Sequence, residues 1–403
     1  MLRRALREPA QRVTAPRDLD PPLGGRYAFL RSFSWDSRGY ASLEVHRNGR
    51  RRVGGHRGVG RVRRCSRPVA AYDLGPSTSA RRWRARTGRL SVEAFAISRL
   101  YLGEFDRNGL VSPNAWMDYG YDIDGKASTP SSTDVCVPQP CGAGNFVHTE
   151  GHDGIDNSFG HFILPILEVA YSNVDAKAND AILSGSLAFL IIVTGLGAGR
   201  DYSSMTGFAV SAAPTTQPLA WDGTDTWSVD RQSVVGTDVS TASLRGPAYM
   251  SGRVFVATLG GTGGLPVANL RGARLSLAAT HVTISMKVSD DGLSATEGVI
   301  SAVLLPDALV EVGKQIVGSF NPLFCNYGAF ENLANEIRGA SDILLDGTQD
   351  SSQTCNGISA GIGFDAVRVQ LGPVVEVPSG PSPCCTISAD GGVRDASSDA
   401  ACE

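Results

Sequence analysis

The pattern of apolar and polar residues along the middle of the chain predicts strands more often than helices. Apolar residues alternate with polar ones or form short runs bounded by turn residues, as is typical of strands. One strand is expected over residues 92–102, where Gly103 ends the run. Further strands are predicted at 186–194, 207–212, 252–259, 364–371 and 273–288, the last holding two strands or one long bent strand.

Helical spacing of apolar residues is confined to two patches of the chain. Residues 162–183 suit one or two amphipathic helices, with Pro165 near a start. A helix is predicted over 307–320 and another over 329–344, because apolar residues recur every three or four positions in each. Since the helices do not alternate with the strands, the pattern disfavours a doubly wound sheet. It predicts a mainly β (α+β) domain, namely an antiparallel β-sandwich with helical insertions.

The globular domain is expected over residues 91–375. Residues 376–403 are rich in Cys, Ser and Gly, which is typical of a tail. The whole chain has 42% hydrophobic and 19% charged residues, and this balance excludes global disorder and long coiled coils. No apolar run approaches the ~18 residues of a membrane-spanning helix, so no transmembrane segment is expected.

Charge separates the first 90 residues from the rest. Residues 1–90 hold 22 arginines, no lysine and six acidic residues, whereas the remainder is acidic. A basic segment with interspersed aromatic rings is one way to bind nucleic acid. However, these arginines follow no helical or alternating pattern, and arginine without lysine is typical of very GC-rich DNA. We therefore expect either a disordered extension or one that results from a start codon assigned too far upstream, and no nucleic-acid partner.

Seven of the eight cysteines lie in the acidic part of the chain, in loops rich in Pro, Gly, Ser and Asn. Paired Cys-x-x-Cys spacings, which a structural zinc site would show, are absent, so the sequence predicts disulfides. The most natural pairs are Cys136–Cys141, Cys325–Cys355, and Cys402 with Cys384 or Cys385. Disulfides imply an oxidising, extracytoplasmic compartment, yet residues 1–12 show no apolar stretch of a signal peptide.

Two glycine-rich motifs come close to known catalytic patterns and are rejected. Residues 357–361 match the G-x-S-x-G nucleophile elbow, but a strand is predicted to follow and no histidine comes later in the chain. Residues 120–127 lack the hydroxyl of a phosphate-binding loop, and their aspartates would repel phosphate. Neither a serine hydrolase of this type nor a nucleotide-binding protein is expected.

Acidic residues at short spacing beside glycine form a candidate calcium site. The residues are Asp122, Asp124, Asp153, Asp156 and Asn157. Calcium takes six to eight oxygen ligands from flexible acidic loops, although Asp and Asn also form turns with their own backbone. Both interpretations stay open, and calcium is the only cofactor predicted.

Three histidines in the same region suggest a transition-metal alternative. His148, His152 and His161 lie close together in the sequence. Gly151 and Gly154 argue against the helix that would align His148 with His152, so a transition-metal site is disfavoured.

A resemblance to a known family rests on three segments, namely residues 114–125 (Asn-Ala-Trp-Met-Asp-Tyr-Gly-Tyr-Asp-Ile-Asp-Gly), 150–160 and 355–366. Over about residues 92–375 the chain resembles a family of uncharacterised bacterial exported proteins and predicted lipoproteins. The resemblance implies export, with a signal peptide and a lipid-acceptor cysteine ahead of the domain, and it implies no activity. This chain departs from the family because Cys65 has no apolar segment or lipobox around it.

Two functions of different classes fit these features. The first is a non-catalytic extracytoplasmic binding or surface protein, braced by disulfides and calcium, with a cell-surface or polysaccharide ligand. Exposed aromatic rings would stack on sugars in that case, and the candidates are Trp116, Tyr119, Trp221 and Trp227. The alternative is a secreted polysaccharide hydrolase, with a carboxylate pair drawn from Asp122, Asp124, Asp222 or Asp225. We expect the non-catalytic function.

Overall fold

A computed structural model describes the part of the chain that follows the arginine-rich segment. The described residues are 91–142, 146–170, 172–197, 199–215, 217–261, 264–270, 273–378, 380, 382–387 and 393–395. The predicted extension, residues 1–90, lies outside the described residues.

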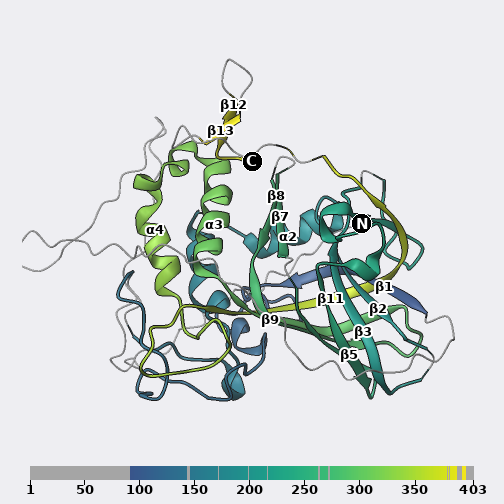
Figure 1. The fold of residues 1–403 in the computed structure, drawn as a ribbon, viewed down its shortest axis with the longest axis horizontal. Coiled ribbons are helices and arrows are strands. Elements are labelled where there is room, and N and C mark those ends of the chain that lie inside the picture. The colour runs from purple at the N-terminus through teal and green to yellow at the C-terminus, as the bar shows by residue number, and fades with distance from the viewer. Residues whose placement is uncertain are drawn as a thin grey trace, which may run out of the picture. The chain divides into compact units, whose positions relative to one another are not determined.

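Eight antiparallel strands form a closed barrel (Figure 1). Each strand pairs with the next in the order β1-β2-β3-β5-β6-β9-β10-β11, and β11 pairs back with β1. The strands are β1 (Val92–Tyr101), β2 (Phe189–Thr194), β3 (Tyr202–Ser211), β5 (Leu244–Ser251), β6 (Val254–Leu259), β9 (Ala279–Val288), β10 (Ser294–Leu304) and β11 (Ile358–Val375).

The predicted β-sandwich is therefore wrong. The pairing of the first strand with the last closes the sheet, because Phe95 of β1 lies opposite Ile191 of β2 on one side and Arg368 of β11 on the other. Alternating apolar positions are common to sandwiches and barrels, so the pattern alone did not distinguish them.

Side chains from every barrel strand meet in one interior core. Phe95, Ile191, Phe255 and Ile284 are among its members, and each is at most 1% exposed. Neighbouring residues in β1 and β2 point outward into a second core, which contains Trp227 and Val229 of β4 (Thr226–Asp230). β4 pairs in parallel with the end of β11, so it covers part of the outer face. This double burial explains why the sequence of β2 is apolar without interruption.

Helices cover one end of the barrel strands. α3 and α4 lie side by side, with the hairpin of β7 and β8 next to α3 (Figure 1). α3 begins with Pro306 directly after β10, and Asn326 caps α4 by accepting a hydrogen bond from Gly328 N at 2.8 Å. The α-helices are α1 (Leu164–Ala170), α2 (Val174–Leu183), α3 (Pro306–Phe320) and α4 (Tyr327–Gly339).

The remaining elements are short. A π-helical turn covers Phe159–Ile163, and 3-10 turns cover Ala115–Asp118, His152–Gly154, Arg231–Ser233, Val239–Thr241 and Pro322–Cys325. Two small hairpins pair β7 (Leu265–Leu270) with β8 (Ala273–Leu277) and β12 (Cys385–Ile387) with β13 (Val393–Asp395). The predicted helices and strands are present, with shifted ends, and the sequence analysis missed β4, β5, β7, β10, β12 and β13.

Two disulfides join described segments that are far apart in the sequence. Cys136 pairs with Cys355, and Cys325 pairs with Cys384. The predicted pairs Cys136–Cys141 and Cys325–Cys355 are wrong, because the fold places other loops beside these cysteines. Cys141 is also disulfide-bonded. Cys384 is fully buried, so part of the segment after residue 376 packs against the domain.

Within the described residues, no helix combines the length and the apolar character that crossing a membrane requires.

Candidate metal centre

Two loops meet at the outer side of β11, and their acidic residues include the buried Asp156 and the half-buried Asp124, Glu150 and Asp342. The acidic loop, residues 104–158, follows β1, and the 340–357 loop joins α4 to β11. The Cys136–Cys355 disulfide joins them. Beside it, Val137 N donates to Gln353 O at 2.8 Å, and Cys355 N donates to Val137 O at 2.9 Å. The two loops are therefore held together covalently and through their backbones.

Three carboxylates of the acidic loop converge. Each of Asp122, Asp124 and Asp156 offers an oxygen atom, and all these oxygens lie within 4.8 Å of one another. Asp122 is exposed, Asp124 is half-buried and Asp156 is 1% exposed. The group therefore runs from solvent to the interior, and only Asp156 is fully buried.

The backbone of the acidic loop positions these carboxylates. Ile123 N donates to Asp156 Oδ2 at 2.7 Å, and Asp156 N donates to Tyr121 O at 3.0 Å. Gly154 has a φ of +82°, and a Cβ there would lie 2.5 Å from Lys126 O. Glycine at this position allows the two halves of the site to approach each other.

Asp156 has one oxygen with no hydrogen-bond partner. Its Oδ1 is buried, and only Oδ2 accepts a hydrogen bond. Burial, with further repulsion from Asp342 and Asp124, raises the pKa of Asp156 to about 9. A buried carboxylate in this setting takes up a proton or a cation, because the bare charge is costly.

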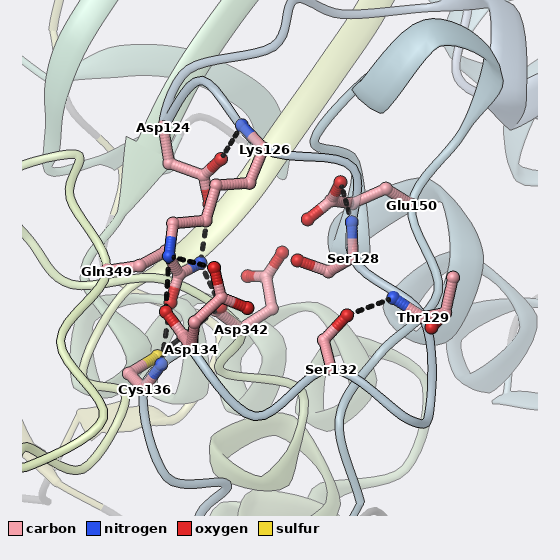
Figure 2. Close-up of polar contacts among 10 residues, drawn as sticks. All are labelled: Asp124, Lys126, Ser128, Thr129, Ser132, Asp134, Cys136, Glu150, Asp342 and Gln349. Carbon is pink, nitrogen blue, oxygen red and sulfur yellow. Dashed lines mark hydrogen bonds and ion pairs between the residues drawn. The ribbon is translucent and has the colours of Figure 1, made fainter.

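Two more acidic side chains face the same region. Figure 2 shows Glu150 and Asp342 pointing into the space between the loops that carry them. Burial raises the pKa of Asp342 to about 7, although Ser359 N donates to it at 2.8 Å. Burial also raises the pKa of Glu150. The negative potential therefore extends beyond the three converging aspartates.

Gln349 connects the two loops at this point (Figure 2). Its Nε2 donates to Asp124 Oδ2 at 2.6 Å and to Asp342 O at 3.0 Å. Its Oε1 accepts a hydrogen bond from Cys136 N at 2.8 Å. Gln349 therefore fixes the position of the Asp124 carboxylate and is neutral, so it does not compensate the charge.

The neighbouring lysine is engaged by another carboxylate. Lys126 Nζ lies 2.7 Å from Asp134 Oδ2 and also donates to the backbone carbonyl of Asp134 (Figure 2). Its backbone N–H donates to Asp124 Oδ1 at 2.8 Å. The close ion pair of Lys126 is thus with Asp134.

The other two predicted calcium ligands lie outside this group. Asp153 is exposed, at a φ of +54°, and is not one of the three converging aspartates. Asn157 is 2% exposed and its amide attaches the acidic loop to the barrel. Its Nδ2 donates to Trp116 O, Tyr119 O and Gly361 O, and its Oδ1 accepts from Gly160 N and Gly361 N. The structure therefore brings together three of the five predicted residues and gives Asn157 a structural role.

The three histidines of the region have separate partners. His148 Nδ1 lies 3.2 Å from Ser158 Oγ, and His152 Nδ1 lies 2.7 Å from Asp118 Oδ1. His161 stacks on Trp116 with ring centroids 4.0 Å apart. Among the described residues, the only converging group of possible metal ligands is the aspartate group.

Most of the predicted sugar-stacking rings lie inside the protein. Trp116, Tyr119 and Trp227 are 4%, 1% and 1% exposed, so the expectation that they are exposed is wrong. Trp221 is half-buried and packs against Trp227 with ring centroids 5.9 Å apart. These residues fill the contacts between loops and barrel, as large aromatic side chains usually do.

Of the carboxylates considered for hydrolysis, Asp222 and Asp225 belong to a turn that is separate from the converging aspartates. Asp222 accepts hydrogen bonds from Thr224, which lower its pKa, and Asp225 accepts from Ala220 N and Trp221 N. A cavity lined by Glu150 and Asp342 has a volume of about 10 Å³. That volume is close to what one water molecule needs. No observation at this site favours a polysaccharide substrate.

Sequence reasoning named Asp122, Asp124 and Asp156 but missed Asp342 and Gln349. Both missed residues belong to the 340–357 loop, about two hundred positions later in the chain. No spacing pattern connects them with the acidic loop, and only the fold brings them there.

No protein-family model matches this chain, and neither a curated protein nor a solved structure matches it. The resemblance to bacterial exported proteins stays a prediction, and the proposal below is argued from the geometry of the site.

Proposed function

We propose that this chain is an extracytoplasmic, non-catalytic protein whose acidic loop is held in place by a calcium ion at Asp122, Asp124 and Asp156. One observation carries the proposal. Asp156 Oδ1 is buried without a hydrogen-bond partner, in a group whose ligand oxygens lie within 4.8 Å of one another. An ion between these carboxylates would supply the missing partner and neutralise their charge.

The donor set fits a hard divalent cation. All three side chains offer carboxylate oxygens, and calcium accepts such ligands together with backbone carbonyls and waters in flexible geometry. Because Asp122 is exposed, water has access to that side of the site. Magnesium demands a stricter octahedral arrangement and retains several waters, so it fits this loop-built, partly buried set less well.

The disulfides support an oxidising compartment. Cys136–Cys355 and Cys325–Cys384 each close a long segment of chain, with sequence separations of 219 and 59 between the partners. Such bridges persist mainly in secreted, periplasmic or surface proteins. Calcium is abundant enough outside the cell for a site with an ordinary extracellular affinity to be occupied there.

Thermal unfolding of the full chain tests the proposal. Calcium should raise the melting temperature relative to chelator, because an ion that binds only the folded state stabilises it by about 2.7 kcal/mol at a hundredfold excess over Kd. Asp156→Asn should abolish the calcium effect, since the amide lacks the negative charge. It should leave the melting temperature in chelator unchanged or raised.

Asp153→Asn is the matched control, because it removes a carboxylate from the same loop outside the converging group. It should retain the calcium effect. A wild-type melting temperature that is the same in calcium and in chelator would refute the proposal, as would an equal calcium effect in Asp156→Asn.

A further inference from the structure

A second feature lies inside the core, where the helices pack against the barrel strands. A cavity of about 170 Å³ lies between the ends of the barrel strands, the α-helices and the β7–β8 hairpin. Barrel residues Ile97, Phe189 and Ala302 line one side, and helical residues Ala178, Leu309 and Val312 line another. Each lining residue that the structure describes is buried or half-buried.

The chemistry of the wall is uniform. Every described residue of the lining is aliphatic, phenylalanine or glycine, so no side chain there donates or accepts a hydrogen bond. Water needs two to four polar partners to occupy an internal site, and this wall gives it none from side chains. Apolar cavities of roughly 150 Å³ lined by Leu, Ile and Phe stay dry and take up benzene or xenon. The space here is of that size and character.

The walls are held in place by covalent and packing restraints. α3 follows β10 directly, and the Cys325–Cys384 disulfide lies beside it. A Cβ at Gly318 of α3 would collide with the sulfur atoms of both cysteines. The opposite wall is the closed barrel, which has no free edge to move inward. The cavity is therefore not free to collapse onto itself.

Acidic groups near the α1–α2 side set the charge of an acceptable ligand. Leu102 lines the cavity, and its backbone N–H donates to the fully buried Asp175 at 2.7 Å. Glu104 and Glu168 interact with Asp175 and with each other. A carboxylate or phosphate on the ligand would meet like charge on this side, so an uncharged ligand is favoured.

We propose that this cavity is a binding site for a small uncharged hydrocarbon, the size of a single aromatic ring or a short alkyl chain. The inference goes beyond the proposed cation site and does not depend on it, because the two sites use different residues. Recognition here is by shape and apolar contact alone.

Benzene binding to the full chain tests the proposal. Titration calorimetry should detect saturable binding of benzene, and benzoate should bind at least about tenfold more weakly because its charge would lose its hydration. Crystals pressurised with xenon should show an anomalous peak between Ala302, Ala178 and Leu309. Failure of benzene to bind, together with no xenon peak in the cavity, would overturn the proposal.

Two filling variants and one matched control locate the site. Ala178→Leu and Ala302→Leu put extra carbon atoms into the cavity from opposite walls, and both should abolish benzene binding. Ala176→Leu changes the same helix as Ala178→Leu at an exposed position and should bind benzene as the wild type does. If Ala302→Leu fails to fold, Ala178→Leu still decides the outcome. Unchanged benzene affinity in a folded filling variant would overturn the proposed location.

Discussion

At the scale of single residues, Asp156 is an acidic residue whose surroundings disfavour its negative charge. It accepts one backbone hydrogen bond, leaves Oδ1 without a partner and lies near the carboxylates of Asp122 and Asp124. Burial raises its pKa to about 9 and that of Asp342 to about 7. Without a cation, the folded chain therefore holds protons that the unfolded chain has lost at neutral pH.

This protonation predicts how stability depends on pH in chelator. Because both pKa values are raised in the folded chain above the unfolded value of 3.8, their contribution to stability is complete below about pH 4. It is lost as the pH rises through about 7 for Asp342 and about 9 for Asp156. The free energy of unfolding in chelator should fall between pH 6 and pH 9.

The stabilisation by calcium should instead grow as the pH rises, because a cation displaces protons from its ligands and therefore binds more tightly at higher pH. Denaturant unfolding at several pH values, with and without calcium, measures both trends. A calcium-induced gain in stability that shrinks from pH 6 to pH 9 would contradict this account of Asp156.

At the scale of elements, the Cys136–Cys355 disulfide holds the 340–357 loop against the acidic loop. This loop supplies Gln349, which fixes the Asp124 carboxylate, and Asp342, which adds negative charge. The Cys325–Cys384 disulfide lies beside α3 at the helical end of the barrel. The two bridges should therefore affect different sites.

Removing each bridge separately tests that division. Cys136→Ala with Cys355→Ala should weaken calcium binding, since the loops lose the restraint that pre-organises the site. Cys325→Ala with Cys384→Ala should destabilise the chain by roughly 2–4 kcal/mol but leave the calcium affinity of the folded protein unchanged. Calorimetric titration with calcium, beside denaturant unfolding, gives both quantities. Equal calcium affinities in the two double variants would contradict the assigned role of the Cys136–Cys355 bridge.

The positions of most helices and strands could be predicted from the sequence, but the distant segments that they contact could not. Short apolar runs located β1 and β2, and helical spacing located α3 and α4, because these patterns reflect burial of each element on its own. The partner of Cys136 and the approach of Gln349 to Asp124 depend on contacts between distant segments. No local pattern predicts such contacts, so the disulfide pairs were predicted wrongly and Asp342 and Gln349 were missed.

At the scale of the whole molecule, barrel closure is the feature that the sequence did not reveal. Sandwich and barrel share the same inward and outward alternation, and they differ here in whether β1 pairs with β11. Closure leaves neither strand with a free edge along that pairing, so the backbone N–H groups of both are protected on each side.

Hydrogen exchange tests closure directly. Peptides covering residues 92–96 should exchange as slowly as peptides covering β9 and β10, since this part of β1 pairs with β2 and, from Ala94 onward, also with β11. If β1 were an edge strand, about half of its amides would lack a partner and would exchange much faster. Fast exchange throughout β1 under conditions where β9 and β10 stay protected would contradict the closed barrel.

The central claim is that a divalent cation lies between Asp122, Asp124 and Asp156, and anomalous diffraction tests it most directly. Crystals of the full chain grown with calcium should show an anomalous peak roughly 2.3–2.6 Å from a carboxylate oxygen of each of the three residues. The peak should vanish after soaking with chelator and should be absent from crystals of Asp156→Asn. A map at saturating calcium with no peak between these carboxylates would contradict the claim.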